Sequence, residues 1–438
     1  MLRGVGVGLR AEIAGDLVRD PTSVDFVEVV AESCYVSQAA TREAEALREL
    51  LPVVPHGVKL SLGSAEGIDV ERARRLGALA RRLRAPLVSE HVSFVRAGGL
   101  ELGHLTPLPR TREAVDVVAR NTAVARRALG DVPLLLENVA TTFRHVEREA
   151  REGDFYAEIA EQTGCSLLFD VANLYANALN AGLDPVLEAR AFPHERIAMI
   201  HVAGGVFEDG YYLDDHAHAV PEAVLEMLAD ALSRAGDVPV LIERDAAFPP
   251  FGELLGEVDR VRAARAVGGD VTPRARGLVP VGARPLRVTE EALARAFVGG
   301  DASNELGLAP GDVSRTRAIL TRKRADEALP LVPAVAAHPE ARQLALQIVE
   351  QTPRPAALAG VVDAVRIARR ALEVPALRLA ASRDLLSLEA RFAGEPGAAS
   401  FGPRRGPYVA RRVVGRETLY AVKPPGAAAR LRLFAVRR

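Results

Sequence analysis

The chain is poor in sulfur-containing and aromatic residues. Its 438 residues include 2 cysteines, 3 methionines and no tryptophan, and aromatic residues make up 5%. The two cysteines, Cys34 and Cys165, lie far apart and without the close spacing of metal-binding cysteines. This pattern argues against a disulfide framework and favours a reducing compartment.

Long apolar runs and an excess charge of one sign are also lacking. No apolar run approaches the ~18 residues that a membrane span requires. The N-terminus enters a strand-like segment, Val5–Leu9, without the apolar region of a signal peptide. The chain has 56 Lys+Arg and 57 Asp+Glu, and this net charge of -1 indicates neither a nucleic-acid nor a membrane partner. We therefore expect a cytoplasmic protein with no nucleic-acid or membrane partner.

What the sequence does contain, over its first ~265 residues, is a regular alternation of strand and helix patterns. The length of 438 residues predicts one large domain and a smaller one. The expected strands are Val5–Leu9, Phe26–Glu32, Leu51–His56, Leu87–His91, Leu134–Asn138, Leu167–Asp170, Ala198–His201 and Val238–Glu243, and the clearest helices are Asp69–Arg84, Thr111–Ala128, Asp154–Thr163 and Pro221–Ala235. This repetition predicts an α/β fold, a (β/α)8 TIM barrel, over 1–266. An open doubly wound sheet is less favoured, because no GxGxxG follows the first strand.

The rest of the chain predicts a linker and a second domain. Residues 267–285 are rich in Gly, Pro and Arg and lack a sustained period, as in an interdomain linker. Residues 286–438 predict a smaller, mainly helical domain that ends in a small antiparallel sheet. Its expected helices are Thr289–Phe297, Glu340–Glu350, Ala356–Glu373 and Leu377–Phe392, and its expected strands are Tyr408–Val414, Thr418–Val422 and Ala429–Val436. Thr289, followed by two glutamates, is expected to cap the first of these helices.

The terminal strands carry charge of one sign. Arg404, Arg405, Arg411, Arg412, Arg416, Lys423, Arg430, Arg432, Arg437 and Arg438 stand against Glu417 alone. Either this is a solvated charged surface, or it is a docking face for an acidic peptide. Both interpretations stay open.

Ionisable residues recur where the expected strands end, which is where barrel enzymes place their chemistry. They are His56, His91, Glu137, Asp170, His201 and Glu243, with Asp214 and His216 in the loop after the seventh strand and Glu28 and Glu32 along the second. Burying so many such groups without a counter-ion costs several kcal/mol per charge, so we predict bound metal. Imidazole and carboxylate without thiolate suit iron, manganese or zinc. The excess of ligands predicts two or three ions, bridged by carboxylates such as Glu137 or Asp170.

Several motifs together resemble the multinuclear non-haem iron-dependent oxidative enzymes, the family of the methanobactin-biosynthesis oxidase. The resemblance covers Gly4 to Ala266. Its motifs are Gly6–Arg10, His56–Gly63, Ser89–Phe94, Leu136–Asn138, Asp170–Asn173, Ile200–Gly204, Asp214–His216 and Ile242–Asp245.

This resemblance implies a barrel that holds two or three iron ions and uses dioxygen to modify a cysteine in a ribosomally synthesised precursor peptide. It implies eight iron ligands: His56, His91, Glu137, Asp170, His201, Asp214, His216 and Glu243. Of these we expect Glu137, Asp170 and His216 to be catalytic, with Glu32, Asn138 and Asn173 orienting the ligands from behind. Members commonly act with a separate partner protein that presents the peptide, and residues 286–438 are a candidate for that role within one chain.

Two other functions remain open. A xylose-isomerase-like sugar isomerase or an endonuclease-like hydrolase would use similar metal ligands in the same architecture, and neither needs a redox-active ion. A non-catalytic peptide-binding protein would use the barrel only as a scaffold. Spectroscopy of the bound metal separates the first alternative from the oxidase, and substitution of His91 with Glu137 separates the second.

Overall fold

The structure is a computed structural model that describes residues 2–146, 149–265, 277–299, 304–355, 358–398, 400–426 and 430–437. Residues 267–276 of the expected linker lie outside the described residues. The chain divides into two compact units, and the first comprises Met1–Ala97 with Leu105–Glu290. The second comprises Gly98–His104 with Glu291–Arg438. No helix in the described ranges is long and apolar enough to cross a membrane.

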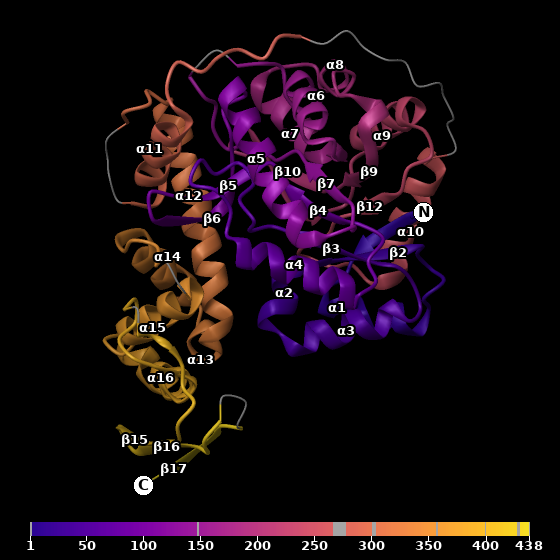
Figure 1. Ribbon diagram of the computed structural model, residues 1–438. Coiled ribbons are helices and arrows are strands. Elements are labelled where there is room, and N and C mark those ends of the chain that lie inside the picture. The colour runs from indigo at the N-terminus through magenta and orange to yellow at the C-terminus, as the bar shows by residue number, and fades with distance from the viewer. Residues whose placement is uncertain are drawn as a thin grey trace. The chain divides into compact units, whose positions relative to one another are not determined.

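The first unit is built around a closed barrel of parallel strands (Figure 1). Its strands, in their order around the barrel, are β1 (Val5–Gly8), β12 (Val240–Ile242), β9 (Ile197–Val202), β8 (Ser166–Asp170), β7 (Leu134–Glu137), β4 (Val88–His91), β3 (Val53–Gly57) and β2 (Phe26–Val30). The predicted TIM barrel is thus confirmed, and each observed strand overlaps its expected range. Nearly all strand residues are buried, as parallel strands covered by helices require.

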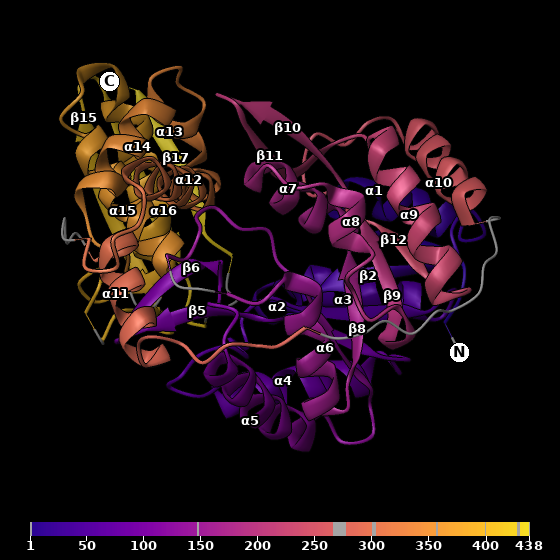
Figure 2. The same cartoon turned by 90° about the horizontal axis from the view of Figure 1, so that it is seen from above.

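Helices surround the barrel strands (Figure 2). They are α1 (Ala11–Arg19), α2 (Ala31–Val36), α3 (Gln38–Arg48), α4 (Val70–Arg82), α5 (Arg112–Leu129), α6 (Glu152–Thr163), α7 (Val171–Ala181), α8 (Pro185–Ala189), α9 (Glu222–Ala235) and α10 (Phe251–Arg265), with a 3-10 turn at His194–Arg196. Two antiparallel hairpins that the sequence analysis missed follow β4 and β9. They are β5 (Ser93–Ala97) with β6 (Leu100–Pro107), and β10 (Gly204–Glu208) with β11 (Tyr211–His218). Short stretches of alternating polar and apolar residues are hard to tell from loops in the sequence when they lie between a strand and a helix of a βα repeat.

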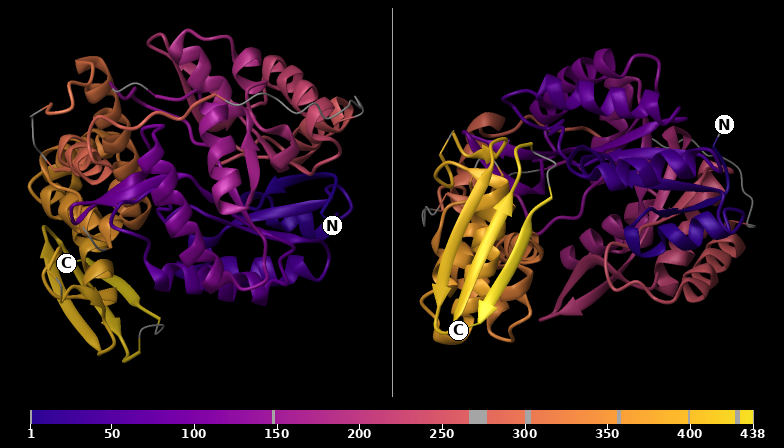
Figure 3. Two further views of the ribbon diagram at one scale, coloured as in Figure 1. Left: turned by 45° about the horizontal axis from the view of Figure 1, so that its top comes forward. Right: turned by 90° about the horizontal axis from the view of Figure 1, so that it is seen from below.

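The second unit is helical with a small terminal sheet, as predicted (Figure 3). Its helices are α12 (Pro310–Ala328), α13 (Pro333–Ala336), α14 (Ala341–Gln351), α15 (Ala359–Ala371) and α16 (Arg378–Arg391), with 3-10 turns at Leu329–Leu331 and Pro375–Leu377; α11 (Leu286–Val298) contains the division between the units. Two short strands, β13 (Phe392–Ala393) and β14 (Gly402–Pro403), pair with each other, and β15 (Tyr408–Val414), β16 (Glu417–Lys423) and β17 (Arg432–Arg437) form the terminal sheet.

Two details of this region differ from the expectation. The helix α12 was not anticipated, because its polar and apolar residues follow no strong helical period. The cap assigned to Thr289 was wrong, since α11 already begins at Leu286. From inside the helix, the Thr289 hydroxyl donates to the Pro285 carbonyl at 3.4 Å. A Ser or Thr that bonds back to the preceding turn does not mark a helix start.

The packing of α4 on α5 depends on a glycine. A Cβ at Gly77, in the middle of α4, would lie 2.4 Å from the carbonyl oxygen of Ala128 in α5. Backbone cannot move aside as a flexible side chain can. By contrast, a Cβ at Gly15, in the middle of α1, would meet nothing within 4 Å.

We therefore predict opposite effects of the same substitution in two helices. Gly77→Ala should destabilise the protein by about 1–3 kcal/mol, because it overpacks the α4–α5 contact. Gly15→Ala should stabilise it by about 0.5–1 kcal/mol through helix propensity. Thermal unfolding of the two variants and of the parent protein measures both changes in stability. Equal shifts in the two variants would contradict the close approach at Gly77.

Candidate metal centre

The inward-facing side chains of the barrel form an apolar layer and, above it, a polar one. The apolar layer contains Phe26, Val54, Leu87, Leu135, Leu168, Met199 and Leu241, together with Leu2. Side chains two residues apart on a strand share a face. Two residues after these apolar side chains stand Glu28, His56, Ser89, Glu137, Asp170, His201 and Glu243, and His91 follows Ser89 by two. Strand periodicity therefore places these polar side chains at one end of the barrel interior.

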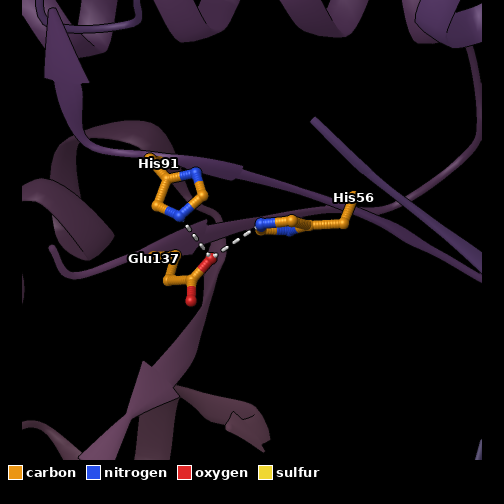
Figure 4. Close-up of side chains that lie close together, drawn as sticks. All are labelled: His56, His91 and Glu137. Atoms are coloured by element: carbon orange, nitrogen blue, oxygen red, sulfur yellow. Dashed lines mark ion pairs between the residues drawn. The ribbon is translucent and has the colours of Figure 1, made fainter. Parts of the chain in front are cut away.

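One group of candidate ligands consists of His56, His91 and Glu137. The Nε2 atoms of His56 and His91 lie 3.5 and 3.3 Å from the same carboxylate oxygen, Oε2 of Glu137. Figure 4 shows both imidazoles directing a ring nitrogen at that oxygen. All three side chains are buried, so an ion among them would have protein atoms as its main ligands.

A second group shares Glu137 with the first and adds Asp170, His201 and Glu243. The other oxygen of Glu137, Oε1, lies 3.3 Å from Nδ1 of His201. Oε2 of Glu243 lies 3.4 Å from the same nitrogen. Glu137 therefore presents one oxygen to each group, as a bridging carboxylate does.

A third group shares Glu243 with the second and adds His216 and Asp245. Nδ1 of His216 lies 3.4 Å from Oε2 of Glu243 and 3.4 Å from Oδ2 of Asp245. The hairpin strand β11 delivers His216, and the Asp245 amide donates to the His216 carbonyl at 2.9 Å. His216 has a φ of 53°, a left-handed conformation that costs a non-glycine residue roughly 1 kcal/mol.

Each imidazole has a partner at its other nitrogen. Nδ1 of His56 lies 2.7 Å from Ser89 Oγ, and Nδ1 of His91 lies 3.2 Å from the Gly57 carbonyl. Nε2 of His201 lies 3.2 Å from Glu28 Oε2, and Nε2 of His216 lies 2.7 Å from Asp214 Oδ2. Such contacts fix the ring orientation and aim the remaining nitrogen at a metal position.

Two asparagines hold Asp170. Its amide donates to Asn138 Oδ1 at 2.8 Å, and its carbonyl accepts from Asn138 Nδ2 at 2.9 Å. Oδ1 of Asp170 accepts from the Asn173 amide at 2.8 Å and so caps α7. Nδ2 of Asn173 donates in turn to the Asn138 carbonyl at 3.0 Å. None of these bonds uses Oδ2 of Asp170, so this oxygen is available to bind a metal.

Burial and mutual repulsion perturb the protonation of these groups. Burial and the neighbouring Asp214 and Glu137 raise the pKa of Asp170 to about 8. Burial opposes the charged form of His91, but the Glu137 carboxylate and Glu90 raise its pKa to about 9. Burial also disfavours the Glu137 carboxylate, yet His91, His56 and His201 lower its pKa. A cation would relieve the repulsion among the carboxylates.

Several buried polar atoms of the centre have no hydrogen-bond partner among the described residues. They are both carboxylate oxygens of Glu137, Oδ2 of Asp170, Nδ1 of His201, Oδ1 of Asp214 and Nδ1 of His216. Leaving a buried polar atom unsatisfied costs about 1–3 kcal/mol. These atoms are also the nitrogen and oxygen donors that transition metals bind. The residues present therefore fit a bound metal.

The structure brings most of the predicted ligands together and adds others. His56, His91, Glu137, Asp170, His201, His216 and Glu243 fall in the three groups, whereas Asp214 belongs to none and contacts His216 instead. Glu32 accepts from the Val58 amide at 3.3 Å and lies outside the groups. Asp245 and Ser89 were given no role from the sequence, and Glu28 was noted among the ionisable residues of the second strand without a role. The alternation from Phe26 to Glu28 and from Leu87 to Ser89 is the signal that could have placed two of them.

Comparison with known proteins matches the barrel region. The family model described as "RiPP precursor modification enzyme MbnB/TglH/ChrH" matches residues 4–266. A UPF0276 protein of Streptomyces avermitilis is 45% identical over 266 residues, which are 59% of this chain and 54% of that protein. The match thus spans only about half of the Streptomyces protein. A UPF0276 protein of Caulobacter vibrioides is 38% identical over 60% of this chain and 95% of its own length.

Solved structures that are similar to the barrel region bear other names. A xylose isomerase domain protein from Planctomyces limnophilus has 17% identity and a TM-score of 0.39, over 60% of this chain and 94% of that one. Endonuclease IV from Thermus thermophilus has 21% identity and a TM-score of 0.40, over 60% and 98%. At such identities and TM-scores, the likeness supports no conclusion about activity.

We predict that Asn138 is needed for metal affinity. Asn138→Ala removes both bonds to the Asp170 backbone and should weaken metal binding about 10–100-fold, because Asp170 loses its fixed position. Titration of the metal-free protein against a competing chelator measures this. Asn121→Ala is the matched control, since the buried Asn121 amide donates to Leu62 and Ser64 carbonyls outside the groups. Equal metal affinity in the two variants would contradict the prediction.

Proposed function

This chain belongs to the family of RiPP precursor modification enzymes MbnB/TglH/ChrH, and on that premise we propose that it is an iron- and dioxygen-dependent oxidoreductase. The family indicates an enzyme that acts on a ribosomally synthesised precursor peptide. The proposal adds that two or three iron ions are the cofactor, that a peptidyl cysteine is the residue modified, and that the reaction takes place in the cytoplasm.

The observation that carries this proposal is the sharing of carboxylates between groups. Glu137 joins the first group to the second, and Glu243 joins the second to the third. Shared carboxylates hold neighbouring ions in a multinuclear site. Every donor is an imidazole nitrogen or a carboxylate oxygen, a set that suits iron.

When bound, iron supplies redox chemistry with dioxygen and lowers the pKa of a substrate thiol. Glu137, which belongs to two groups, would be a ligand in both. Asp170, anchored through Oδ1, would offer Oδ2 as a rigid ligand. His216, on a hairpin rather than a barrel strand, would belong to the third group.

Exposure indicates the side from which a peptide would approach. His201 and Asp170 are fully buried, whereas the side chains of His216 and Asp245 are 15% and 45% exposed. The third group is therefore the solvent-facing end of the centre. We propose that the substrate cysteine enters past His216 and Asp245.

The first test is the metal content of protein made in iron-supplemented cells under low oxygen. We expect at least two irons per chain, with a Mössbauer spectrum of high-spin iron with nitrogen and oxygen ligands. Glu137→Gln should lose more than one iron, because Glu137 belongs to two groups. Glu152→Gln, a buried carboxylate outside the groups, should keep the parent content. One zinc or manganese without iron would instead support an isomerase or hydrolase.

We further propose that the terminal sheet docks the precursor peptide. One face of the sheet packs Leu419 and Ala421 against Leu386 of α16. The opposite face exposes Val409, Arg411, Val413, Val422, Arg432, Phe434 and Val436, and Tyr420 stacks on Phe434 at 5.3 Å between ring centroids. Figure 3 shows the three strands side by side. An apolar face flanked by arginines is suited to an amphipathic, acidic peptide segment.

The charge of this face is not neutralised internally. Arg411 and Arg432 on this face make no ion pair with any described residue, and neither do Arg416, Arg430 and Arg437 elsewhere in the terminal sheet and its turns. By contrast, Arg412 pairs with Glu389 at 2.6 Å and Glu417 pairs with Arg383 at 3.4 Å. The proposal makes this sheet the site that presents the peptide. A separate partner protein would then be an addition rather than a necessity.

Charge reversal tests the docking face in the full chain. Arg411→Glu with Arg432→Glu should weaken binding of a fluorescent Glu-rich, cysteine-containing peptide at least ~10-fold, because attraction becomes repulsion. Fluorescence anisotropy at two salt concentrations measures the dissociation constant of the peptide. Arg342→Glu with Arg370→Glu changes the net charge equally at exposed positions on α14 and α15 and should have little effect. Equal losses of peptide affinity in both double variants would contradict the docking proposal.

A further inference from the structure

The hairpin that carries His216 is not part of the barrel sheet. In the ranges that the structure describes, β10 and β11 pair with each other and with no barrel strand. A two-stranded hairpin by itself is at best marginally stable in water. Contacts with other elements must therefore fix the hairpin, and with it the position of His216 in the third group.

Helix α7 supplies one such contact through Asn180, and β11 lies beside this helix (Figure 2). Oδ1 of Asn180 accepts from the Tyr212 amide at 2.8 Å, and Nδ2 donates to the Tyr212 carbonyl at 2.9 Å. One side chain thus pairs with both backbone groups of Tyr212, as a residue of a neighbouring strand would. The buried Tyr212 ring also packs edge-on against Tyr175 of α7, at 5.2 Å between ring centroids.

This side chain is the last of three asparagines on one face of α7. They are spaced by four residues and then by three, and they are Asn173, Asn177 and Asn180. The first donates to the Asn138 carbonyl at 3.0 Å. The second accepts from the Thr141 amide at 2.8 Å and from the Thr141 hydroxyl at 3.0 Å. Each asparagine of the row therefore holds a different segment of the chain against α7.

The middle asparagine provides a second contact with the hairpin. It fixes Thr141, and the Tyr211 hydroxyl donates to the Thr141 carbonyl. The two anchored residues, Tyr211 and Tyr212, are adjacent on β11 and precede His216 by five and four residues. Both contacts therefore act on the strand segment that leads directly to the candidate ligand.

The other end of α7 begins at a candidate ligand. Asp170 is the N-cap of the helix, and Asn180 lies ten residues further along, about 15 Å along the helix axis. The helix end does not require the Asn180 side chain, because Gly182, in a left-handed conformation, donates to the Ala178 and Leu179 carbonyls and so closes α7. One helix thus carries Asp170 of the second group and holds the strand of the third.

We propose that Asn180 is a positioning residue of the metal centre, which holds His216 in the third group through Tyr212 and β11. The first group lies outside this arrangement, because the barrel strands β3, β4 and β7 carry its side chains. The proposal rests on the proposed function only in that the centre binds metal. It does not depend on the identity of the metal or of the substrate.

Zn²⁺ titration of the full chain, freed of metal and carrying ¹⁵N-labelled histidine, tests this role by NMR. The spectra report Zn²⁺ binding at His216 separately from binding at His56 and His91. Asn180→Ala should weaken the binding that shifts the His216 resonances about 10-fold, because the hairpin loses both bonds to α7. The binding that shifts the His56 and His91 resonances should stay unchanged, which a general loss of stability would not allow.

The second unit offers a matched control. Asn304 pairs with the backbone of one residue in the same way, since its Nδ2 donates to the Leu308 carbonyl at 2.6 Å and its Oδ1 accepts from the Leu308 amide at 2.9 Å. Asn304→Ala therefore removes the same two bonds far along the chain from the candidate ligands. It should change the Zn²⁺ affinity at none of the three histidines.

A milder variant keeps the proposal testable if Asn180→Ala does not fold. Tyr211→Phe removes one hydroxyl and should lower the Zn²⁺ affinity at His216 about 3-fold, again without a change at His56 and His91. Equal losses at all three histidines, or no loss at His216, would overturn the proposal. A protein that takes up no iron in cells but shows the selective loss of Zn²⁺ would refute the proposed function alone.

Discussion

Ionisable groups packed inside a barrel need a counter-charge, and this requirement governs the centre of the molecule. Glu137 and Asp170 are almost or fully buried, and neither could stay ionised beside the other without compensation. Three histidines, His91, His201 and His216, whose pKa values the neighbouring carboxylates raise, supply part of it. Nδ1 of His201, Nδ1 of His216 and both carboxylate oxygens of Glu137 still have no hydrogen-bond partner among the described residues. A bound cation would complete the set. The fold is therefore a scaffold whose stability and whose metal binding are linked.

The barrel meets this requirement by separating its interior into layers. Leu135 and Leu168 lie in the apolar layer, and Glu137 and Asp170 follow them by two residues. The apolar layer excludes water from below and fixes the strands, so that the polar layer is held on rigid elements. Asn138 and Asn173 then use the first residues beyond the strands to lock Asp170. Precise ligand placement thus follows from ordinary strand geometry and a few local hydrogen bonds.

Two features of the chain depart from the repeating strand and helix pattern of the barrel. The hairpin of β10 and β11 brings His216 to the solvent-facing end of the centre in a strained backbone conformation. The terminal sheet gathers unpaired arginines on β15 and β17 around an apolar face. Substrate recognition is commonly encoded in such additions rather than in the scaffold.

The sequence by itself determined the barrel, because eight apolar runs with helices between them leave few alternatives. It also determined most of the candidate ligands, because residues at strand ends must meet at one mouth. It also indicated the helical second part and its terminal strands. Only the tertiary structure decided which nitrogen of each histidine faces inward, that Asp214 stands behind His216, and that Glu28 reaches His201 from a strand that is not its neighbour. These are contacts across the barrel between residues distant in sequence, such as Glu28 and His201. A local pattern shows on which face a side chain lies, whereas the closed barrel decides what it meets there.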